Sequence, residues 1–279
     1  MTSSSKDGDV CYFIMKKTLS DIKAALMGKH IDSEVVLGKY MDKVFELFED
    51  EFEVSEAFYF FNGDKRISIN ENKQKRKRVA SENLHIATQF FTPKWLVQYV
   101  VDNSLGRFLK GVELSFFHGD KAQIGEKEDI TIFDPAVGTG NMLVYAYELL
   151  ADFYRKRGFS KEKIPQKILS SFYGLDIDKR AVEVAKRLLM RKAGVDSFEF
   201  NFYYFELVTP DFLQKVKTLK LKKLFNVFEN WNKYREVGSL IKVGDIGDEL
   251  IILEKHIQTK EEKNIVGIIK TLSKRYDVI

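Results

Sequence analysis

The chain has 279 residues, of which 44% are hydrophobic, and 45 basic residues against 41 acidic ones give a formal net charge of +4. This size allows one large domain, or one domain with a helical extension, and the small charge permits a nucleic-acid partner without requiring one. A single cysteine, Cys11, excludes an internal disulfide framework. No apolar run approaches the roughly 20 residues that span a bilayer, and no signal-peptide pattern opens the chain. We therefore expect a cytoplasmic protein without a membrane partner.

Residues 1–83 read as a helical N-terminal region with a disordered start. Residues 1–10 are small and polar, whereas residues 20–61 carry apolar side chains at helical spacing. The run Lys73–Arg78 then places five cations in six residues. A solvated, mobile loop is the favoured interpretation of such a run, and a phosphate-contacting arm is the alternative. The pattern leaves both open.

Residues 84–279 alternate helical and strand patterns. Thr92 is expected to cap a helix with Pro93 at its first position. Gly106 is a candidate stop for that helix, although the apolar pattern continues through Phe108 and Leu109. Strands are expected at 130–133, 172–175 and 198–205, and helices at 142–154, 164–169, 178–193, 211–235 and 251–274. This alternation predicts an α/β fold with a parallel sheet.

A glycine turn follows the first expected strand. Asp134 ends that strand at the carboxyl edge of the sheet, where ligands of open α/β sheets bind. Gly138 and Gly140 lack the Cβ atoms that would prevent a ligand from approaching the backbone. The turn lacks the third glycine of a dinucleotide motif and the Lys-Ser/Thr of a Walker loop. It therefore favours a ligand with a cationic or zwitterionic end near Asp134 over a pyrophosphate.

A second acid ends the next expected strand. Asp176 follows Gly140 by 36 residues and could accept hydrogen bonds from both hydroxyls of a ribose. Ile177 is then placed to cover an adenine ring. We favour the ribose role for Asp176 over a plain turn residue, and a helix N-cap role for Asp178.

A third element, residues 87–94, precedes the first strand. Its two aromatics and its helix start would provide a hydrophobic wall beside free N–H groups, which suits a carboxylate. Spacing alone favours the simpler interpretation of a staple that docks the helix on the sheet.

Taken in order, three motifs resemble those of the N6-adenine DNA methyltransferases of type I and type IIG restriction-modification systems. They are Gln89–Lys94, Asp134–Gly140 and Gly174–Asp178. The wider text of residues 84–279 is most similar to the large adenine-specific methyltransferases of phage-exclusion (BREX-type) systems. Residues 1–80 match less distinctly.

The resemblance implies a Rossmann-like, S-adenosylmethionine-binding parallel sheet in residues 84–279, incomplete at its carboxyl end and preceded by a helical subdomain. It also implies double-stranded DNA as the partner of the full-length enzyme, together with specificity or defence-system subunits. The residues that the family's motifs assign to the cofactor are Gln89, Phe90, Phe91, Thr92, Pro93, Asp134, Ala136, Gly138, Thr139, Gly140, Asp176 and Ile177. No metal ligand is implied.

The family's catalytic tetrapeptide, Asn/Asp-Pro-Pro-Tyr/Phe, is absent. It accepts the protons of the adenine amine and stacks on the flipped base, whereas none of the four prolines of this chain are neighbours. The final residues, 276–279, match the start of the strand that precedes this tetrapeptide. We therefore assign no catalytic residue and expect the chain to hold the cofactor half of such an enzyme and to be inactive alone. A non-catalytic module that binds DNA or a partner is the alternative, and methylation of another substrate, such as protein glutamine, also stays open.

Overall fold

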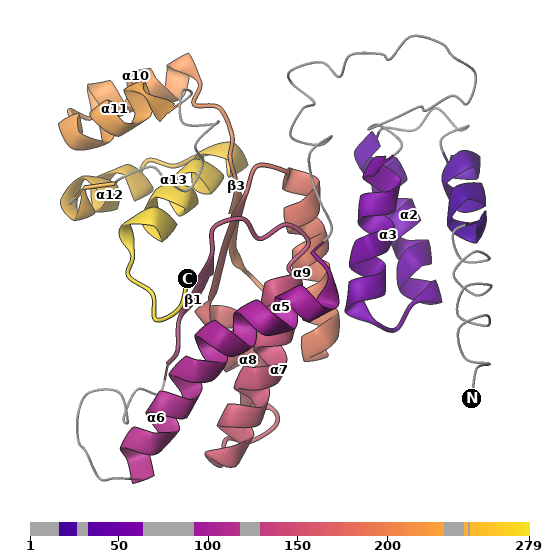
Figure 1. Cartoon of the computed structure of the whole chain (residues 1–279). Coiled ribbons are helices and arrows are strands. Elements are labelled where there is room, and N and C mark those ends of the chain that lie inside the picture. Colours follow the sequence, from indigo (N-terminus) through magenta and orange to yellow (C-terminus); the bar gives the residue numbers. More distant parts are fainter. Residues whose placement is uncertain (1–16, 27–32, 64–91, 118–128, 232–242, 245) are drawn as a thin grey trace, which may run out of the picture. The chain divides into compact units, whose positions relative to one another are not determined.

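The computed structural model describes residues 17–26, 33–63, 92–117, 129–231, 243–244 and 246–279 (Figure 1). The chain divides into two compact units, residues 1–91 and residues 92–279. Among the described residues, no helix has the length and apolar character needed to cross a membrane.

The first unit is helical in its described part. A helix at 17–26 is followed by α2 (Ser33–Leu47) and α3 (Glu51–Gly63). The expected helical stretch 20–61 is therefore divided, and Asp50 marks one break, where its carboxylate accepts a hydrogen bond of 2.8 Å from the backbone N–H of Phe52. Helices α2 and α3 pack through buried apolar side chains, and the hydroxyl of Tyr40 donates to the carbonyl of Ala57 at 3.1 Å.

The second unit begins with α5 (Lys94–Val101). Its N-cap is Pro93, without a side-chain cap, so the expectation that Thr92 caps the helix is wrong by one position. The backbone carbonyl of Pro93 instead accepts the first helical hydrogen bonds from Leu96 and Val97, at 3.0 and 3.1 Å.

Gly106 does not stop this helix. Helix α5 continues through a π-helical turn, η2 (Asp102–Gly106), into α6 (Arg107–Phe117). The buried side chains recur every four residues, at Val97, Val101, Leu105 and Leu109. Such a stripe drifts around an α-helix of 3.6 residues per turn, and a wider turn brings it back onto one face. The continued apolar pattern through Leu109 is thus confirmed.

In the described part of the chain, the sheet has three parallel strands in the order β1 (Ile132–Asp134), β2 (Phe172–Asp176) and β3 (Asn201–Tyr204). On the free side of β1, Val278 forms a single parallel bridge with Ile132. The small parallel sheet among many helices is compatible with part of an α/β fold. The third strand is shorter than the expected 198–205.

Helices cover both faces of the sheet (Figure 1). Helices α7 (Asn141–Lys156), α8 (Lys163–Ser171) and α9 (Lys179–Ala193) lie on one side, and α13 (Lys260–Ser273) lies on the other. Asp178 caps α9 as predicted, because its side chain accepts from the backbone N–H of Arg180 at 2.9 Å.

Helix α13 fits β3 closely at two positions. A Cβ atom on Gly267 would lie 2.1 Å from Cε1 of Tyr203, so only glycine fits there. The side-chain amide of Asn264 pairs with the backbone of Tyr204: its Oδ1 accepts from the N–H at 3.1 Å, and its Nδ2 donates to the carbonyl at 2.6 Å. This amide satisfies backbone groups on the open edge of the sheet.

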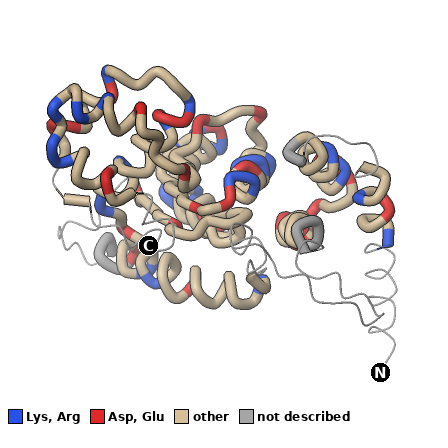
Figure 2. The backbone as a smooth tube through the Cα atoms, turned by 90° about the horizontal axis from the view of Figure 1, so that it is seen from above, with Lys and Arg blue, Asp and Glu red and all other residues tan. Residues whose placement is uncertain are grey.

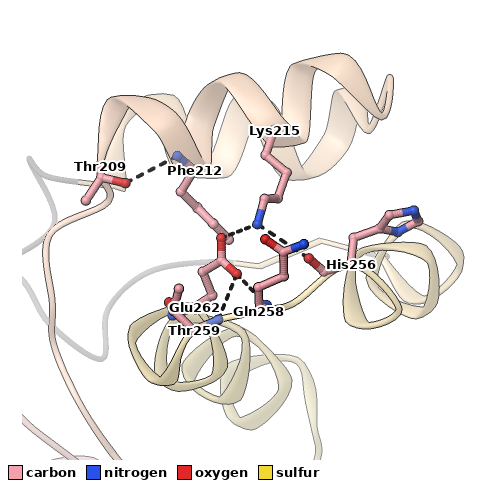
Figure 3. Close-up of polar contacts among 7 residues, drawn as sticks. All are labelled: Thr209, Phe212, Lys215, His256, Gln258, Thr259 and Glu262. Carbon is pink, nitrogen blue, oxygen red and sulfur yellow. Dashed lines mark hydrogen bonds and ion pairs between the residues drawn. The ribbon is translucent and has the colours of Figure 1, made fainter.

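Between β3 and α13 the chain inserts α10 (Pro210–Thr218), α11 (Lys222–Glu229) and α12 (Gly247–Glu254). The expected helical segments 211–235 and 251–274 are therefore each interrupted, at 219–221 and 255–259. Glu262, in the first turn of α13, joins this helix to α10 and to the segment that precedes α13 (Figure 3). Its carboxylate pairs with the ammonium of Lys215 on α10 and accepts from the backbone N–H groups of Gln258 and Thr259 at 2.7 and 3.2 Å.

Candidate functional site

The turn between β1 and α7 is fixed by its own backbone. The N–H of Val137 donates to the carbonyl of Leu175 on β2 at 2.8 Å, and the N–H of Gly140 donates to the carbonyl of Val137 at 2.7 Å. Gly138 and Gly140 have left-handed φ angles of 52° and 86°. A Cβ atom on Gly140 would also lie 3.0 Å from Cβ of Ala185 on α9. Glycine is therefore required at position 140 by conformation and by packing.

Asp176 joins this turn to the end of β2. One carboxylate oxygen accepts from the N–H of Gly138 at 2.7 Å, and the other accepts from the N–H of Asp178 at 2.9 Å. Burial raises the pKa of Asp176, although these two N–H groups act in the opposite direction. Each carboxylate oxygen has two lone pairs, so accepting these two bonds does not use up its capacity as an acceptor. Beside it, the side chain of Ile177 is 39% exposed, although it is apolar.

Asp134 lies at the end of β1 on the same face of the sheet. Its Oδ1 accepts from the N–H of Ala136 at 3.0 Å. Burial raises the pKa of this carboxyl to about 6, the N–H of Ala136 lowers it, and the negative charge of Asp176 raises it further. Two acids that disfavour each other's charge at a ligand-binding edge provide electrostatic attraction for a cation.

The remaining predicted residues differ in how the structure places them. Thr139 is buried in the turn and Ala136 is exposed beside it. Thr92 and Pro93 lie at the start of α5. Gln89, Phe90 and Phe91 lie outside the described residues, so their predicted role is not tested.

Gly174 is a residue of this site whose role the sequence interpretation missed. A Cβ atom there would lie 3.1 Å from Cγ2 of Val137 and 3.1 Å from Cδ1 of Phe202. Gly174 on β2 therefore lets the glycine turn pack against the sheet. Its position two residues before Asp176, in the middle of a strand where glycine is unfavourable, was the available signal.

Two buried acceptor atoms were also missed. Oδ1 of Asn141, at the first position of α7, and Oε2 of Glu206, just after β3, are buried and have no hydrogen-bond partner among the described residues. The backbone of Phe205 donates to the carbonyl of Asp176 at 2.8 Å, so the chain reaching Glu206 leaves from the same edge of the sheet. Buried acceptors need donors, and a ligand with donors could supply them. No sequence pattern marks these two atoms.

Helix α7 begins next to this group of residues. Its N-cap is Gly140, and no side chain caps it. The start of a helix without a side-chain cap offers N–H groups and a favourable dipole to an anion. The edge of the sheet thus combines a carboxylate pair, a helix start and two unsatisfied acceptors, which is a pattern suited to a zwitterionic ligand with hydroxyl groups.

Comparison with known proteins is consistent with this geometry. Residues 122–200 match the family model "MmeI, DNA-methyltransferase domain". This segment contains β1, the glycine turn, β2 and α9. Among curated proteins, the adenine-specific methyltransferase PglX of Lacticaseibacillus casei (strain Zhang) is 25% identical in an alignment that is 308 positions long, gaps included, and covers 86% of this chain. The chain is related to the adenine-specific methyltransferases.

A second adenine-specific methyltransferase, BrxX of Escherichia coli O9:H4 (strain HS), is 35% identical in an alignment that is 145 positions long, gaps included, and covers 43% of this chain. These matches confirm the resemblance predicted from the three motifs. The matched regions cover 25% of the length of PglX and 12% of that of BrxX. This chain thus corresponds to a minor part of each of these adenine-specific methyltransferases.

Proposed function

We propose that residues 84–279 form the S-adenosylmethionine-binding part of a Rossmann-like N6-adenine DNA methyltransferase, preceded by a helical region at 1–83. The single observation that carries this proposal is a hydrogen bond between the turn after Asp134 and the carboxylate of Asp176. The N–H of Gly138, in the turn after Asp134, donates to Asp176 at 2.7 Å. That bond supports the proposal because it joins the turn after Asp134, the proposed cation site, to Asp176, the proposed diol site on the neighbouring strand.

The described residues fit the cofactor group by group. Asp134 would hold the ammonium of the methionine end, and the start of α7 would meet its carboxylate. Asp176 would accept from the ribose hydroxyls, and Ile177 would cover the adenine ring. The two unsatisfied acceptors would meet the remaining donors. Asn141, at the start of α7, would accept from the amino-acid end, and Glu206, just after β3, would accept from the base. Bound there, the cofactor would supply an electrophilic methyl group.

Within these 279 residues, the tetrapeptide that would activate the adenine amine is absent. The four prolines are Pro93, Pro135, Pro165 and Pro210, so no Pro-Pro pair is present. We propose that the chain binds the cofactor and does not methylate DNA by itself. In the full-length protein we expect double-stranded DNA as substrate, specificity or defence-system subunits as partners, a cytoplasmic location and a role in restriction-modification or phage defence.

Calorimetric titration of the purified chain with S-adenosylmethionine tests the cofactor site. We expect measurable binding, and Asp176→Asn should weaken it by roughly 10- to 150-fold, since a hydrogen bond to a charged group contributes about 1.5–3 kcal/mol. Asp196→Asn, which removes an exposed acid after α9, is the matched control and should bind as the parent chain does. Absence of binding at millimolar cofactor would reject the proposal, and so would equal binding by the two variants.

The absent tetrapeptide supports a second candidate, a module that binds DNA or a partner on a degenerate methyltransferase fold. This candidate needs no cofactor, so Asp176→Ala should leave its interactions unchanged. Methylation of an adenine-containing duplex by the chain alone would reject both the module and the predicted inactivity.

A further inference from the structure

The turn between α10 and α11 carries a cluster of cations that the cofactor site does not use. Four lysines between positions 217 and 223 are exposed, and we call them the corner lysines: Lys217, Lys220, Lys222 and Lys223. Three apolar residues next to them point inward, because Val216, Leu221 and Leu224 are almost fully buried. Burial of these three side chains directs the lysines outward.

The backbone of this corner is held in one conformation. The N–H groups of Lys220 and Leu221 close the end of α10 by donating to the carbonyls of Lys217 and Val216, at 3.0 and 3.2 Å. The carboxylate of Glu249 on α12 accepts from the first N–H groups of α11, those of Lys223 and Leu224, at 3.2 and 2.9 Å. The four ammonium groups thus project from a fixed frame.

One of the corner lysines occupies a position that local stability disfavours. Lys220 has a left-handed φ of 59°, where glycine would be preferred, and this conformation costs an L-residue free energy. Lys222 and Lys223 lie in the first turn of α11, where cations oppose the helix dipole. The carboxylate of Glu249 at the start of α11 offsets that effect. Only Lys217, in the last turn of α10, is placed where the dipole favours it.

Internal ion pairs do not account for the exposure of Lys217, Lys220 and Lys222. None of the carboxylates in the described part of the chain forms an ion pair with Lys217, Lys220 or Lys222. The neighbouring Lys215 differs, because it turns toward Glu262 (Figure 3). Elsewhere basic and acidic positions are mixed along much of the described backbone (Figure 2).

We propose that the corner lysines contact the phosphate backbone of double-stranded DNA. This inference rests on the proposed function, which makes DNA the substrate, and it adds the surface that meets it. A phosphodiester backbone presents many anions to ammonium groups spread around a corner. A membrane surface fits less well, since interfacial binding needs exposed apolar side chains and those of the corner are turned inward.

Salt dependence of duplex binding is the test. Lysine–phosphate contacts each contribute about 0.9 to the slope of log K against log salt concentration. The variant Lys217→Gln, Lys220→Gln, Lys222→Gln should lose three such contacts. Between 50 and 200 mM salt, the affinity of the parent chain for the duplex should therefore fall by on the order of 40-fold more than the affinity of the variant. Fluorescence anisotropy with a labelled duplex measures both curves.

The matched control removes three exposed lysines that likewise have no ion pair among the described residues: Lys110→Gln, Lys161→Gln, Lys163→Gln. These positions lie on α6 and around the start of α8, away from α10 and α11 (Figure 1). The control should keep the parent's slope. Lys220→Gly should reduce the slope by about 0.9 while raising the melting temperature, because glycine tolerates the left-handed conformation.

Equal slopes for the corner variant and its control would overturn the inference, and so would a parent chain that does not bind the duplex. Binding to anionic vesicles that depends equally on the corner lysines would overturn it in favour of a membrane. Cofactor titration of the same samples separates the two proposals. If the corner variant binds S-adenosylmethionine like the parent and also keeps the parent's salt dependence of DNA binding, only the proposed DNA surface is rejected. If the parent chain binds no cofactor, the proposed function is rejected.

Discussion

Replacing Asp134 with asparagine should stabilise the chain without ligand. Burial raises the pKa of this carboxyl from 3.8 to about 6. The folded state therefore holds a proton over a pH range in which the unfolded chain has lost it, and stability falls as pH rises from about 4 to about 6. Each pKa unit corresponds to about 1.4 kcal/mol, so the charged Asp134 costs up to about 3 kcal/mol at neutral pH. Asparagine keeps the Oδ1 that accepts from Ala136 and carries no charge.

The assay is denaturation of Asp134→Asn and the parent chain at pH 4 and pH 7.5. We expect the two to be similar at pH 4 and the variant to be more stable at pH 7.5. For a unit of this size, each kcal/mol corresponds to about 2–4 °C in melting temperature. Asp196→Asn, at an exposed site, should show no such pH-dependent gain.

An asparagine variant that is no more stable than the parent at pH 7.5 would refute the reasoning. A gain that persists unchanged at pH 4 would also refute it, because the carboxyl is then protonated in the parent. Under the proposed function the same variant should bind S-adenosylmethionine more weakly, since the ammonium of the cofactor loses its counter-charge.

Three further outcomes are expected. Burial raises the pKa of Glu262, but the ammonium of Lys215 and backbone N–H groups outweigh burial and hold that pKa below 4.5. The parent chain should therefore be more stable than Lys215→Met at pH 7, and this difference should disappear as pH falls below about 4.5. Urea denaturation at several pH values measures the difference. Gly267→Ala should destabilise the chain by about 1–3 kcal/mol in thermal denaturation, because its Cβ would overlap the ring of Tyr203, and an added Tyr203→Leu should recover part of the loss; an unchanged melting temperature would contradict the packing. In calorimetry, Asn141→Leu should weaken binding of S-adenosylhomocysteine roughly tenfold or more. Binding of 5′-methylthioadenosine, which lacks the amino acid, should be unchanged. Equal losses for both ligands would show that the Asn141 amide does not contact the amino-acid end.

Local signals made several elements predictable from the sequence. The start of α9 at Asp178 follows from a side chain that caps its own helix, and its end coincides with Gly194 in the left-handed conformation. The two acids at the ends of β1 and β2 follow equally from strand patterns and a glycine turn. Such features depend on residues within one turn of each other, which a sequence displays directly.

Features set by tertiary packing were not predictable in the same way. Gly106 was a candidate helix stop beside a continuing apolar pattern, and the sequence did not indicate the π-helical turn that keeps the apolar stripe of α5 and α6 on one face. The break at 255–259 lies beside Glu262, which accepts from the N–H groups of Gln258 and Thr259 and pairs with Lys215 on α10, far away in the sequence. The unsatisfied acceptors of Asn141 and Glu206 depend on what surrounds them, and polar residues at such positions carry no pattern of their own.

The two tryptophans give this chain a built-in optical reporter. Trp231 is buried, stacks on Phe205 and donates its indole N–H to the carbonyl of Glu206 at 2.8 Å, whereas Trp95 on α5 is 67% exposed. Both belong to residues 92–279, and residues 1–91 contain no tryptophan. Tryptophan emission therefore monitors the second unit alone, while circular dichroism monitors the helices of both. Trp231 donates to the backbone carbonyl of Glu206, just after β3. A change in its short-wavelength emission on titration would therefore report, without a label, ligand binding at the carboxyl edge of the sheet.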